Sequence, residues 1–239
     1  MKLDDLINKN ILVTGATSGI GKNLTIKLIE AGANVAFCGR SIEKMTTLLN
    51  EIGETKGHIH YKAFDISNEN EIILFVKEAT NKIGTFDVLI NCAGANTMRS
   101  LVSKIETNDL MYMLKINTIA PFIFMREVYR SMEIAKKGTV INVLSTVCNF
   151  SNEGIGAYTA SKASFDALVK VFRKEVRLKN IKVCSIYPGG TNTSFRNTNK
   201  PEYLEVESVV EAIFTMILVD LNASIDELTI RPMVEKNYN

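Results

Sequence analysis

Tryptophan is absent from this chain of 239 residues, histidine occurs twice, and cysteine and proline occur four times each. The two histidines, His58 and His60, alternate along one expected strand without carboxylate or cysteine companions, which indicates ordinary strand or surface side chains. The cysteines are single and widely spaced, so we expect reduced thiols, and neither disulfides nor a metal site, at Cys38, Cys92, Cys148 and Cys184.

An excess of charge of one sign is also lacking. The formal net charge of +2 is too small to indicate binding to nucleic acid or to a membrane surface. The amino-terminal residues Met1-Lys-Leu-Asp-Asp begin no hydrophobic stretch long enough for a signal peptide or a membrane span. We therefore expect a cytoplasmic protein with no nucleic-acid or membrane partner.

Short apolar runs alternate with helical patterns along the whole chain, and no repeat or linker interrupts them. The expected strands are Ile11–Thr14, Val35–Cys38, His58–Phe64, Phe86–Ile90, Thr139–Leu144, Lys182–Tyr187 and Glu227–Ile230. The expected helices lie near residues 20–31, 41–52, 69–83, 106–134, 158–179 and 205–219. This alternation predicts an α/β fold: a single doubly wound Rossmann domain over residues 1–239, with a seven-stranded parallel sheet and helices on both faces. A small substrate-lid segment is expected near residues 191–205.

A tyrosine and a lysine stand four residues apart in Tyr158-Thr-Ala-Ser-Lys162, with Ser145 thirteen residues upstream of the tyrosine. On a helix this spacing places both side chains on one face. At about 5 Å and an effective dielectric of about 20, the ammonium favours the phenolate by roughly 3 kcal/mol, or about two pKa units. The pair therefore indicates a tyrosine tuned for proton transfer near neutral pH.

A glycine-rich turn follows the first expected strand, in Gly15-Ala-Thr-Ser-Gly19-Ile-Gly21. Glycines let the backbone approach a ligand closely, and the start of the next helix presents free N–H groups to a pyrophosphate. The second expected strand ends at Cys38-Gly39-Arg40-Ser41, which has no acidic residue for a ribose 2′-hydroxyl and an arginine suited to a 2′-phosphate. These features favour NADP, with NAD as the alternative.

In their order and spacing these motifs resemble the short-chain dehydrogenase/reductase family over essentially the whole chain. Further matches are Asp65-Ile66, Asn91-Cys92-Ala93-Gly94 with cysteine in place of the second asparagine, and Pro188-Gly189-Gly190-Thr191-Asn192-Thr193 with threonine at the usual valine position. The resemblance implies the catalytic residues Asn117, Ser145, Tyr158 and Lys162. It implies cofactor contacts from Gly15, Thr17, Ser18, Gly19, Ile20, Gly21, Arg40, Ser41, Asp65, Ile66, Asn91, Ala93, Gly94, Tyr158, Lys162, Pro188, Gly189, Thr191 and Thr193, and no metal.

The same resemblance implies a mechanism. Ser145 and Tyr158 would bind the oxygen of a carbonyl or secondary alcohol substrate, and Tyr158 would pass the proton while hydride moves between NADP(H) and carbon. Lys162 would hold the nicotinamide ribose and lower the pKa of Tyr158, and Asn117 would hold a water that links Lys162 to solvent. Two alternatives stay open: a catalytically idle NADP-binding sensor or interaction protein, and a lyase or epimerase that retains its cofactor.

Partners and assembly follow from helix patterns. Lys170, Arg173, Lys174 and Arg177 form a basic stripe that we interpret as a solvated face, the alternative being a docking surface for an acidic carrier protein. The carboxyl end lacks the glycine pair common in 3-oxoacyl-carrier reductases, which weakens a fatty-acid role. Relatives pair the helices at 106–134 and 158–179 across a two-fold axis, so we expect a homodimer or homotetramer. The apolar residues expected to supply the contact are Ile119, Phe122, Ile123, Phe165, Leu168 and Phe172.

Overall fold

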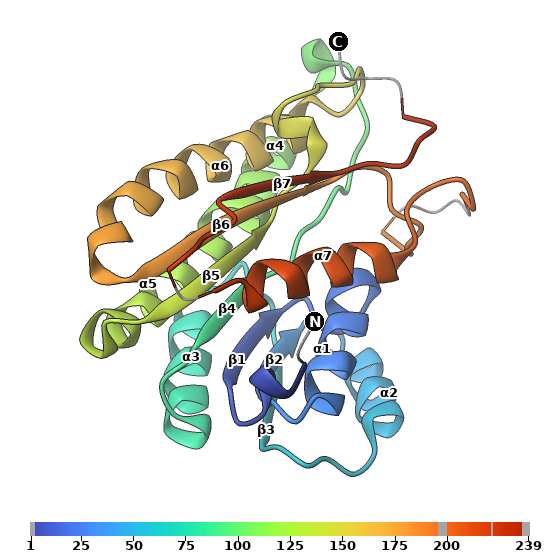
Figure 1. The fold of residues 1–239 in the computed structure, drawn as a ribbon. Coiled ribbons are helices and arrows are strands. Elements are labelled where there is room, and N and C mark those ends of the chain that lie inside the picture. Colours follow the sequence, from blue (N-terminus) through green and yellow to red (C-terminus); the bar gives the residue numbers. More distant parts are fainter. Residues whose placement is uncertain (1–2, 196–199, 221, 236–239) are drawn as a thin grey trace.

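The computed structural model describes residues 3–195, 200–220 and 222–235, and it is built on one seven-stranded parallel sheet (Figure 1). The strands are β1 (Asn10–Thr14), β2 (Asn34–Gly39), β3 (Ile59–Ala63), β4 (Val88–Asn91), β5 (Gly138–Val143), β6 (Ile181–Pro188) and β7 (Glu227–Ile230). Their spatial order is β3-β2-β1-β4-β5-β6-β7. The predicted doubly wound Rossmann fold is confirmed, with strand limits within one or two residues of those expected from the apolar runs.

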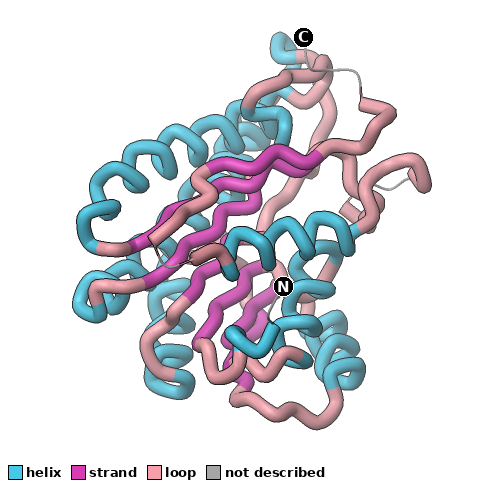
Figure 2. Tube along the Cα trace, viewed as in Figure 1, coloured by secondary structure: helices cyan, strands magenta, loops and turns pink. Residues whose placement is uncertain are grey.

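Helices cover both faces of the sheet (Figure 2). One layer holds α1 (Gly19–Glu30), α2 (Ile42–Ile52) and α7 (Val206–Leu218), and the other holds α3 (Glu69–Ile83), α5 (Ala120–Ala135) and α6 (Gly156–Val176). A shorter helix, α4 (Thr107–Leu114), packs against α6. Two helix starts follow directly from local sequence, because Ser41 accepts the backbone N–H of Lys44 and Asn68 accepts that of Asn70.

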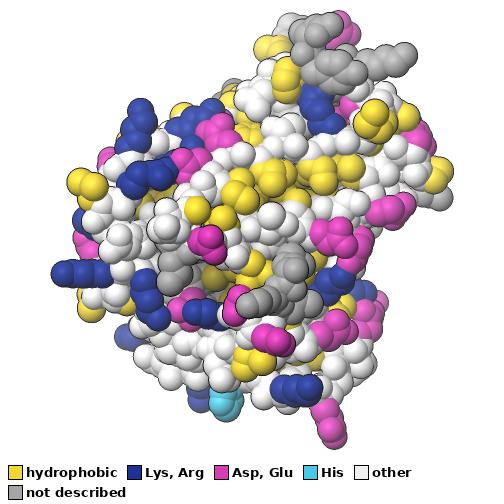
Figure 3. Space-filling model, viewed as in Figure 1, with side chains coloured by type: hydrophobic (Ala, Val, Ile, Leu, Met, Phe, Trp, Pro, Cys, Tyr) yellow, Lys and Arg dark blue, Asp and Glu magenta, His cyan; other side chains and the backbone are white. Residues whose placement is uncertain are grey.

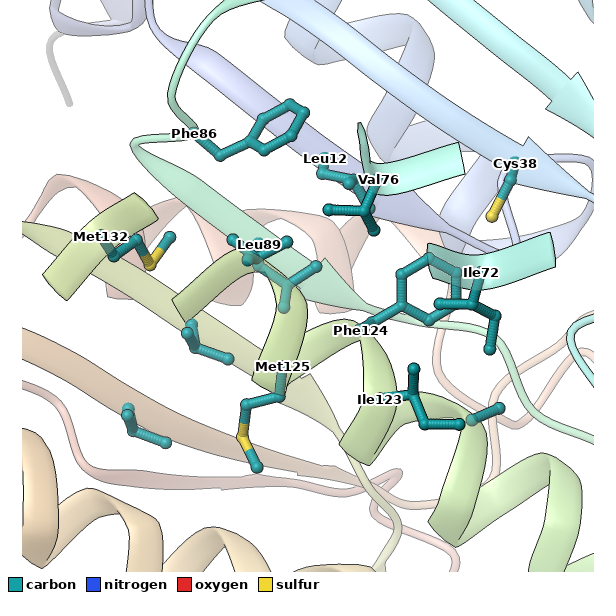
Figure 4. Close-up of a cluster of buried hydrophobic side chains, with 14 of the residues drawn as sticks. Leu12, Cys38, Ile72, Val76, Phe86, Leu89, Ile123, Phe124, Met125 and Met132 are labelled. Atoms are coloured by element: carbon teal, nitrogen blue, oxygen red, sulfur yellow. The ribbon is translucent and has the colours of Figure 1, made fainter. Parts of the chain in front are cut away.

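The hydrophobic core on the α3 and α5 side is drawn in Figure 4, where strand residues point toward helix residues. Leu12 and Leu89 project from β1 and β4 against Ile72 of α3 and Phe124 of α5, and all four are almost completely buried. Burying a side chain of this size stabilises the fold by about 1.5–3 kcal/mol. Because strands covered on both faces are apolar throughout, the sequence shows them as continuous runs.

The prediction of a single helix over 106–134 is wrong in one respect. A π-helical turn at Lys115–Ile119 separates α4 from α5. Pro121 explains part of this break, because it has no N–H to give the carbonyl of Asn117, its partner in a regular helix. Two expectations about side chains are also corrected. Ile123 and Phe165 are buried on the sheet and cannot contribute to an assembly surface.

Arg173 does not belong to a solvated basic face. Its side chain is only 12% exposed, and its guanidinium donates to the Val183 carbonyl, to Ser185 Oγ and to Glu227. Arg173 thus ties α6 to the last two strands. Among the described residues of the stripe, Lys170 pairs with Asp166 and Arg177 with Asp226, which leaves little uncompensated charge for an acidic partner.

The surface carries acidic and basic side chains side by side on the face drawn in Figure 3, where a band of hydrophobic side chains also lies over β7. Within the described ranges, no helix has both the length and the apolar character required to cross a membrane. The direction of the sheet crossovers reverses between β1 and β4. In open α/β sheets the crevice beyond the carboxyl ends of the strands at such a point is the usual place for a ligand.

Candidate active site

A cavity of about 1340 Å³ lies beyond the carboxyl ends of β1 through β6. Its wall includes every cofactor-contact and catalytic residue predicted from the sequence except Asn91 and Asn117. Residues from segments that are far apart in the sequence therefore meet at one site because parallel strands end at one edge of the sheet. The expected lid segment contributes Thr191, Thr193, Phe195, Lys200 and Tyr203 to this wall, and residues 196–199 lie outside the described residues.

The glycine-rich turn between β1 and α1 forms one part of the cavity wall. Gly15 has φ +71°, and a Cβ there would lie 2.7 Å from the Cα of Ala93. A Cβ on Gly21 would lie 2.3 Å from the carbonyl oxygen of Gly15. Thr14 Oγ1 accepts the backbone N–H groups of Cys92 and Ala93 at 3.1 and 3.0 Å, which joins this turn to the end of β4. The turn is thus packed tightly against β4, and the start of α1 opens into the cavity.

β2 ends at Gly39, where there is little room for a side chain. A Cβ on Gly39 would meet Thr17 Cγ2 at 2.4 Å, so this position lies directly under the glycine-rich turn. Arg40 follows and is exposed at the cavity wall, with Nη1 3.5 Å from Tyr112 Oη. Lys44, which sequence reasoning missed, lines the same wall from the first turn of α2. The available signal was a basic residue in the first turn of the helix that follows the second strand.

Of the two predicted cofactor contacts Asp65 and Asn91, one lies on the cavity wall and the other does not. Asp65 lines the cavity and accepts the N–H of Ser67 at 2.8 Å. Asn91 is 2% exposed and lies off the cavity wall, where its Nδ2 donates to Asn142 Oδ1 at 3.0 Å and to the Pro121 carbonyl at 3.3 Å. Its expected direct contact with a cofactor is therefore not supported. Asn91 instead cross-links β4, β5 and the start of α5, which steadies the strand end beside the cavity.

Asn117 sits in the π-helical turn and is fully buried. Its Oδ1 accepts the Ala95 N–H at 2.9 Å, and its Nδ2 donates to the Ala95 carbonyl at 2.8 Å and to Ser161 Oγ at 3.0 Å. The neighbouring Thr118 Oγ1 donates to the Ser161 carbonyl at 2.7 Å. The amide is thus occupied in fixing the loop after β4 to α6, and it does not reach the cavity as the sequence suggested.

Tyr158 and Lys162 lie one turn apart on α6 and both line the cavity, at 9% and 5% exposure. Lys162 Nζ donates to the Val143 carbonyl at 3.0 Å, and Gly94 packs so close that a Cβ would lie 3.3 Å from this nitrogen. Burial lowers the pKa of the Lys162 ammonium, an effect that Cys148 and Cys92 oppose. Ser145 follows β5 by two residues at the same wall, and its Oγ accepts the Val147 N–H at 3.3 Å.

Burial raises the pKa of the neighbouring thiols, to about 12 for Cys92 and about 11 for Cys148. All four cysteines are free thiols. Among the residues whose placement is described, no three His, Cys, Asp or Glu side chains gather as a metal site would require.

The carboxyl-terminal segment after β7 reaches the cavity, which the sequence did not indicate. Val234 and Glu235 line the wall beside Pro188 and Gly189. Glu235 Oε1 accepts the N–H of Gly190 at 2.6 Å across 45 residues of sequence. No periodicity or motif could have found this contact, since it depends on where β7 ends relative to β6.

Comparison with known proteins identifies a matching family, related sequences and a similar solved structure. Residues 9–204 match the family described as short chain dehydrogenase. An uncharacterized oxidoreductase of Staphylococcus aureus strain USA300 is 26% identical over 231 residues, covering 95% of this chain and 99% of that protein. The 3-oxoacyl-[acyl-carrier-protein] reductase of Chlamydia pneumoniae is 29% identical over 204 residues, covering 84% and 82% respectively. The crystal structure of a metagenomic short-chain oxidoreductase in complex with NADP is 26% identical, with a TM-score of 0.84, and covers 96% of this chain and 99% of that one.

Proposed function

Because the chain belongs to the short chain dehydrogenase family, we propose that it is an NADP(H)-dependent oxidoreductase that interconverts a carbonyl compound and a secondary alcohol. The observation that carries the proposal is that the wall of one cavity joins the glycine-rich turn to Ser145, Tyr158 and Lys162. A nucleotide cradle and a proton-transfer pair in one cavity are what hydride transfer to a carbonyl requires.

The residues present fit a nicotinamide dinucleotide. Side chains are missing at Gly15, Gly19 and Gly21 where the backbone borders the cavity, so a pyrophosphate can approach the start of α1. Asp65 and Ile66 would hold the adenine end, and Pro188, Gly189 and the two threonines after them would border the nicotinamide. A bound cofactor would supply or accept the hydride, which no side chain of the protein can do.

The proposed preference for NADP rests on charge at the β2 end of the cavity. Arg40 and Lys44 line this region, and position 39 is a glycine, so it has no acidic side chain to hold a ribose 2′-hydroxyl. A 2′-phosphate here would receive charge-assisted hydrogen bonds, each worth about 1.5–3 kcal/mol.

The protein's own chemistry is proton transfer and orientation. Tyr158 would hold the transferable proton at its Oη, beside the substrate oxygen, and Ser145 Oγ would donate a second hydrogen bond to that oxygen. Lys162 stands one helical turn from Tyr158 on the same cavity wall, so its ammonium would stabilise the negative charge that Tyr158 carries after it gives up its proton. The burial that lowers the pKa of Lys162 also keeps water from screening this interaction.

A proton path beyond Lys162 would use the backbone rather than the amide of Asn117. The side-chain amide of Asn117 is occupied by hydrogen bonds to Ala95 and Ser161. Its backbone carbonyl would accept the N–H of residue 121 in a regular helix, but residue 121 is a proline and has no N–H. We assign that carbonyl the task of holding a water between Lys162 and solvent. Asn117 would thus act by shaping the π-helical turn.

A panel of aldehydes and ketones assayed with NADPH and with NADH tests the proposal. We expect substrate-dependent oxidation of NADPH and a smaller rate with NADH. Substrate conversion without net change in NADPH would point instead to a lyase or epimerase. Cofactor binding without conversion of any carbonyl would point to a sensor. Either result would contradict the proposed reductase.

We also propose a two-fold homodimer through the outer faces of α5 and α6. Exposed apolar side chains support this contact: Leu168 and Val171 on α6 are 42% and 56% exposed, and Ile119, in the π-helical turn directly before α5, is 45% exposed. The hydrophobic band over β7 offers a second surface, so that use of both would give a tetramer (Figure 3).

A further inference from the structure

The segment after β7 is fastened against the cavity by several contacts. The Gly189 N–H donates to the Ile230 carbonyl at 2.8 Å, and the Glu235 N–H donates to the Pro232 carbonyl at 3.1 Å. The Arg231 guanidinium stacks over the ring of Phe150, 4.1 Å from its centroid. Together these contacts hold Glu235 at the wall beside the loop that follows β6.

The carboxylate of Glu235 is only half satisfied. Oε1 accepts the Gly190 N–H, but Oε2 is withdrawn from solvent and has no hydrogen-bond donor among the residues that the structure describes. Gly189 makes room for this oxygen, because a Cβ there would lie 2.4 Å from Oε2. A buried acceptor without a donor destabilises the fold, and more so when the acceptor is charged. A ligand that supplies the donor would recover that free energy.

A second acceptor on the cavity wall is in the same condition. Asn96 Oδ1 is buried and lacks a donor within the described part of the chain. The described wall residues with unpartnered buried side-chain atoms are therefore Asn96 and Glu235, and in both the atom is an oxygen. A ligand that supplies N–H or O–H donors to these two oxygens would satisfy both of them.

The other charged residues of the cavity wall indicate whether a neutral or a charged donor suits Glu235 better. Lys162 is committed to the Val143 carbonyl, and Lys200 is held over Tyr203 and near Glu202. Arg99 and Glu153 line the rim but are exposed to solvent. Glu235 is consequently the wall carboxylate that water screens least, and a protonated amine satisfies it better than a neutral donor does.

We propose that Glu235 is a specificity-determining residue that selects substrates carrying a protonated amine near the reacting carbon. The inference rests on the proposed reductase function and narrows its substrate class to amino ketones and amino alcohols. Asn96 would accept a further N–H or O–H of the same ligand.

Matched pairs of alcohols that differ by an ammonium in place of a methyl group provide the test. The pairs are 1-amino-2-propanol with 2-butanol, 4-amino-2-butanol with 2-pentanol, and 5-amino-2-pentanol with 2-hexanol. Ligand-observed NMR titration on the NADP+-saturated protein reports binding whether or not the alcohol is oxidised. In at least one pair we expect the ammonium compound to bind about 10- to 100-fold more tightly.

Glu235→Gln should reduce this preference to about threefold or less, since the amide keeps an oxygen for the Gly190 N–H but loses the charge. Glu153→Gln removes an exposed carboxylate from the same cavity and should leave the preference unchanged. Equal binding within every pair, or a preference that survives in Glu235→Gln, would overturn the proposal. So would weaker NADPH binding in Glu235→Gln without a change in the preference, which would assign the carboxylate to the cofactor. Failure of the reductase function would appear separately, as binding without oxidation.

Discussion

Replacing Lys162 with methionine should abolish turnover while making the folded protein more stable. Lys162 is 5% exposed, and its ammonium donates a hydrogen bond to a neutral carbonyl, that of Val143, so its burial is poorly compensated. Methionine is close to lysine in shape without the charge, and such substitutions cost less than about 1.5 kcal/mol in packing. Removing a buried donor that is incompletely hydrogen-bonded raises the free energy of unfolding by about 1–3 kcal/mol.

The net expectation at neutral pH is a gain of about 1 kcal/mol, or about 2–4 °C in Tm for a chain of this size. The pH dependence has a definite sign. Because burial lowers the pKa of Lys162 in the folded state, the unfolded state binds more protons between that lowered pKa and about 10.4. The burial penalty is therefore full below this window and is lost as pH rises through it, so the stability gap between the two proteins should narrow.

Urea unfolding at a series of pH values, together with NADPH oxidation on an identified substrate, measures both effects. Lys170→Met on the same helix is the matched control. Lys170 pairs with the buried Asp166 at 2.7 Å, so its loss should destabilise the protein, by roughly 0.5–1 kcal/mol after screening of its half-exposed side chain. If Lys162→Met were less stable than the unchanged protein at pH 7, or kept most of its turnover, the reasoning would be refuted.

Tyr158→Phe should leave NADPH binding nearly intact and lower turnover by at least about 10²-fold, and stopped-flow binding with steady-state rates would reveal a different proton donor if turnover persisted. Arg40→Ala should weaken NADPH binding by about 10- to 100-fold and leave NADH binding nearly unchanged, whereas equal dissociation constants in the unmutated protein would contradict the NADP preference. Burial raises the pKa of Cys148 to about 11, so its alkylation by iodoacetamide should rise about tenfold per pH unit between about pH 8 and 10. A pH-independent rate, judged against Cys148→Ser by mass spectrometry, would count against this. Sedimentation at micromolar concentration should show a species larger than 26.6 kDa, and an active monomer would exclude the proposed dimer.

Local sequence determined the architecture and most of the cavity wall. Continuous apolar runs such as Ile11–Thr14 identify buried parallel strands because neighbours on both faces exclude polar groups. The four-residue spacing of Tyr158 and Lys162 fixes a shared helix face, and the glycine spacing after β1 reports a backbone packed too closely for side chains. These signals are readable because each is a pattern of residue types over a short stretch of sequence, whichever distant segment packs against it.

Tertiary structure alone decided the rest. Asn117 is turned away from the cavity by a π-helical turn whose partners, Ala95 and Ser161, lie 22 and 44 residues away. Arg173 looks solvated from its helix pattern, yet it is held by acceptors on two strands that sequence spacing cannot locate. Glu235 reaches the cavity only because β7 pairs with β6 and delivers the following segment to Gly190. Periodicity records which side of an element is buried, whereas the partner on that side is set by how distant elements pack.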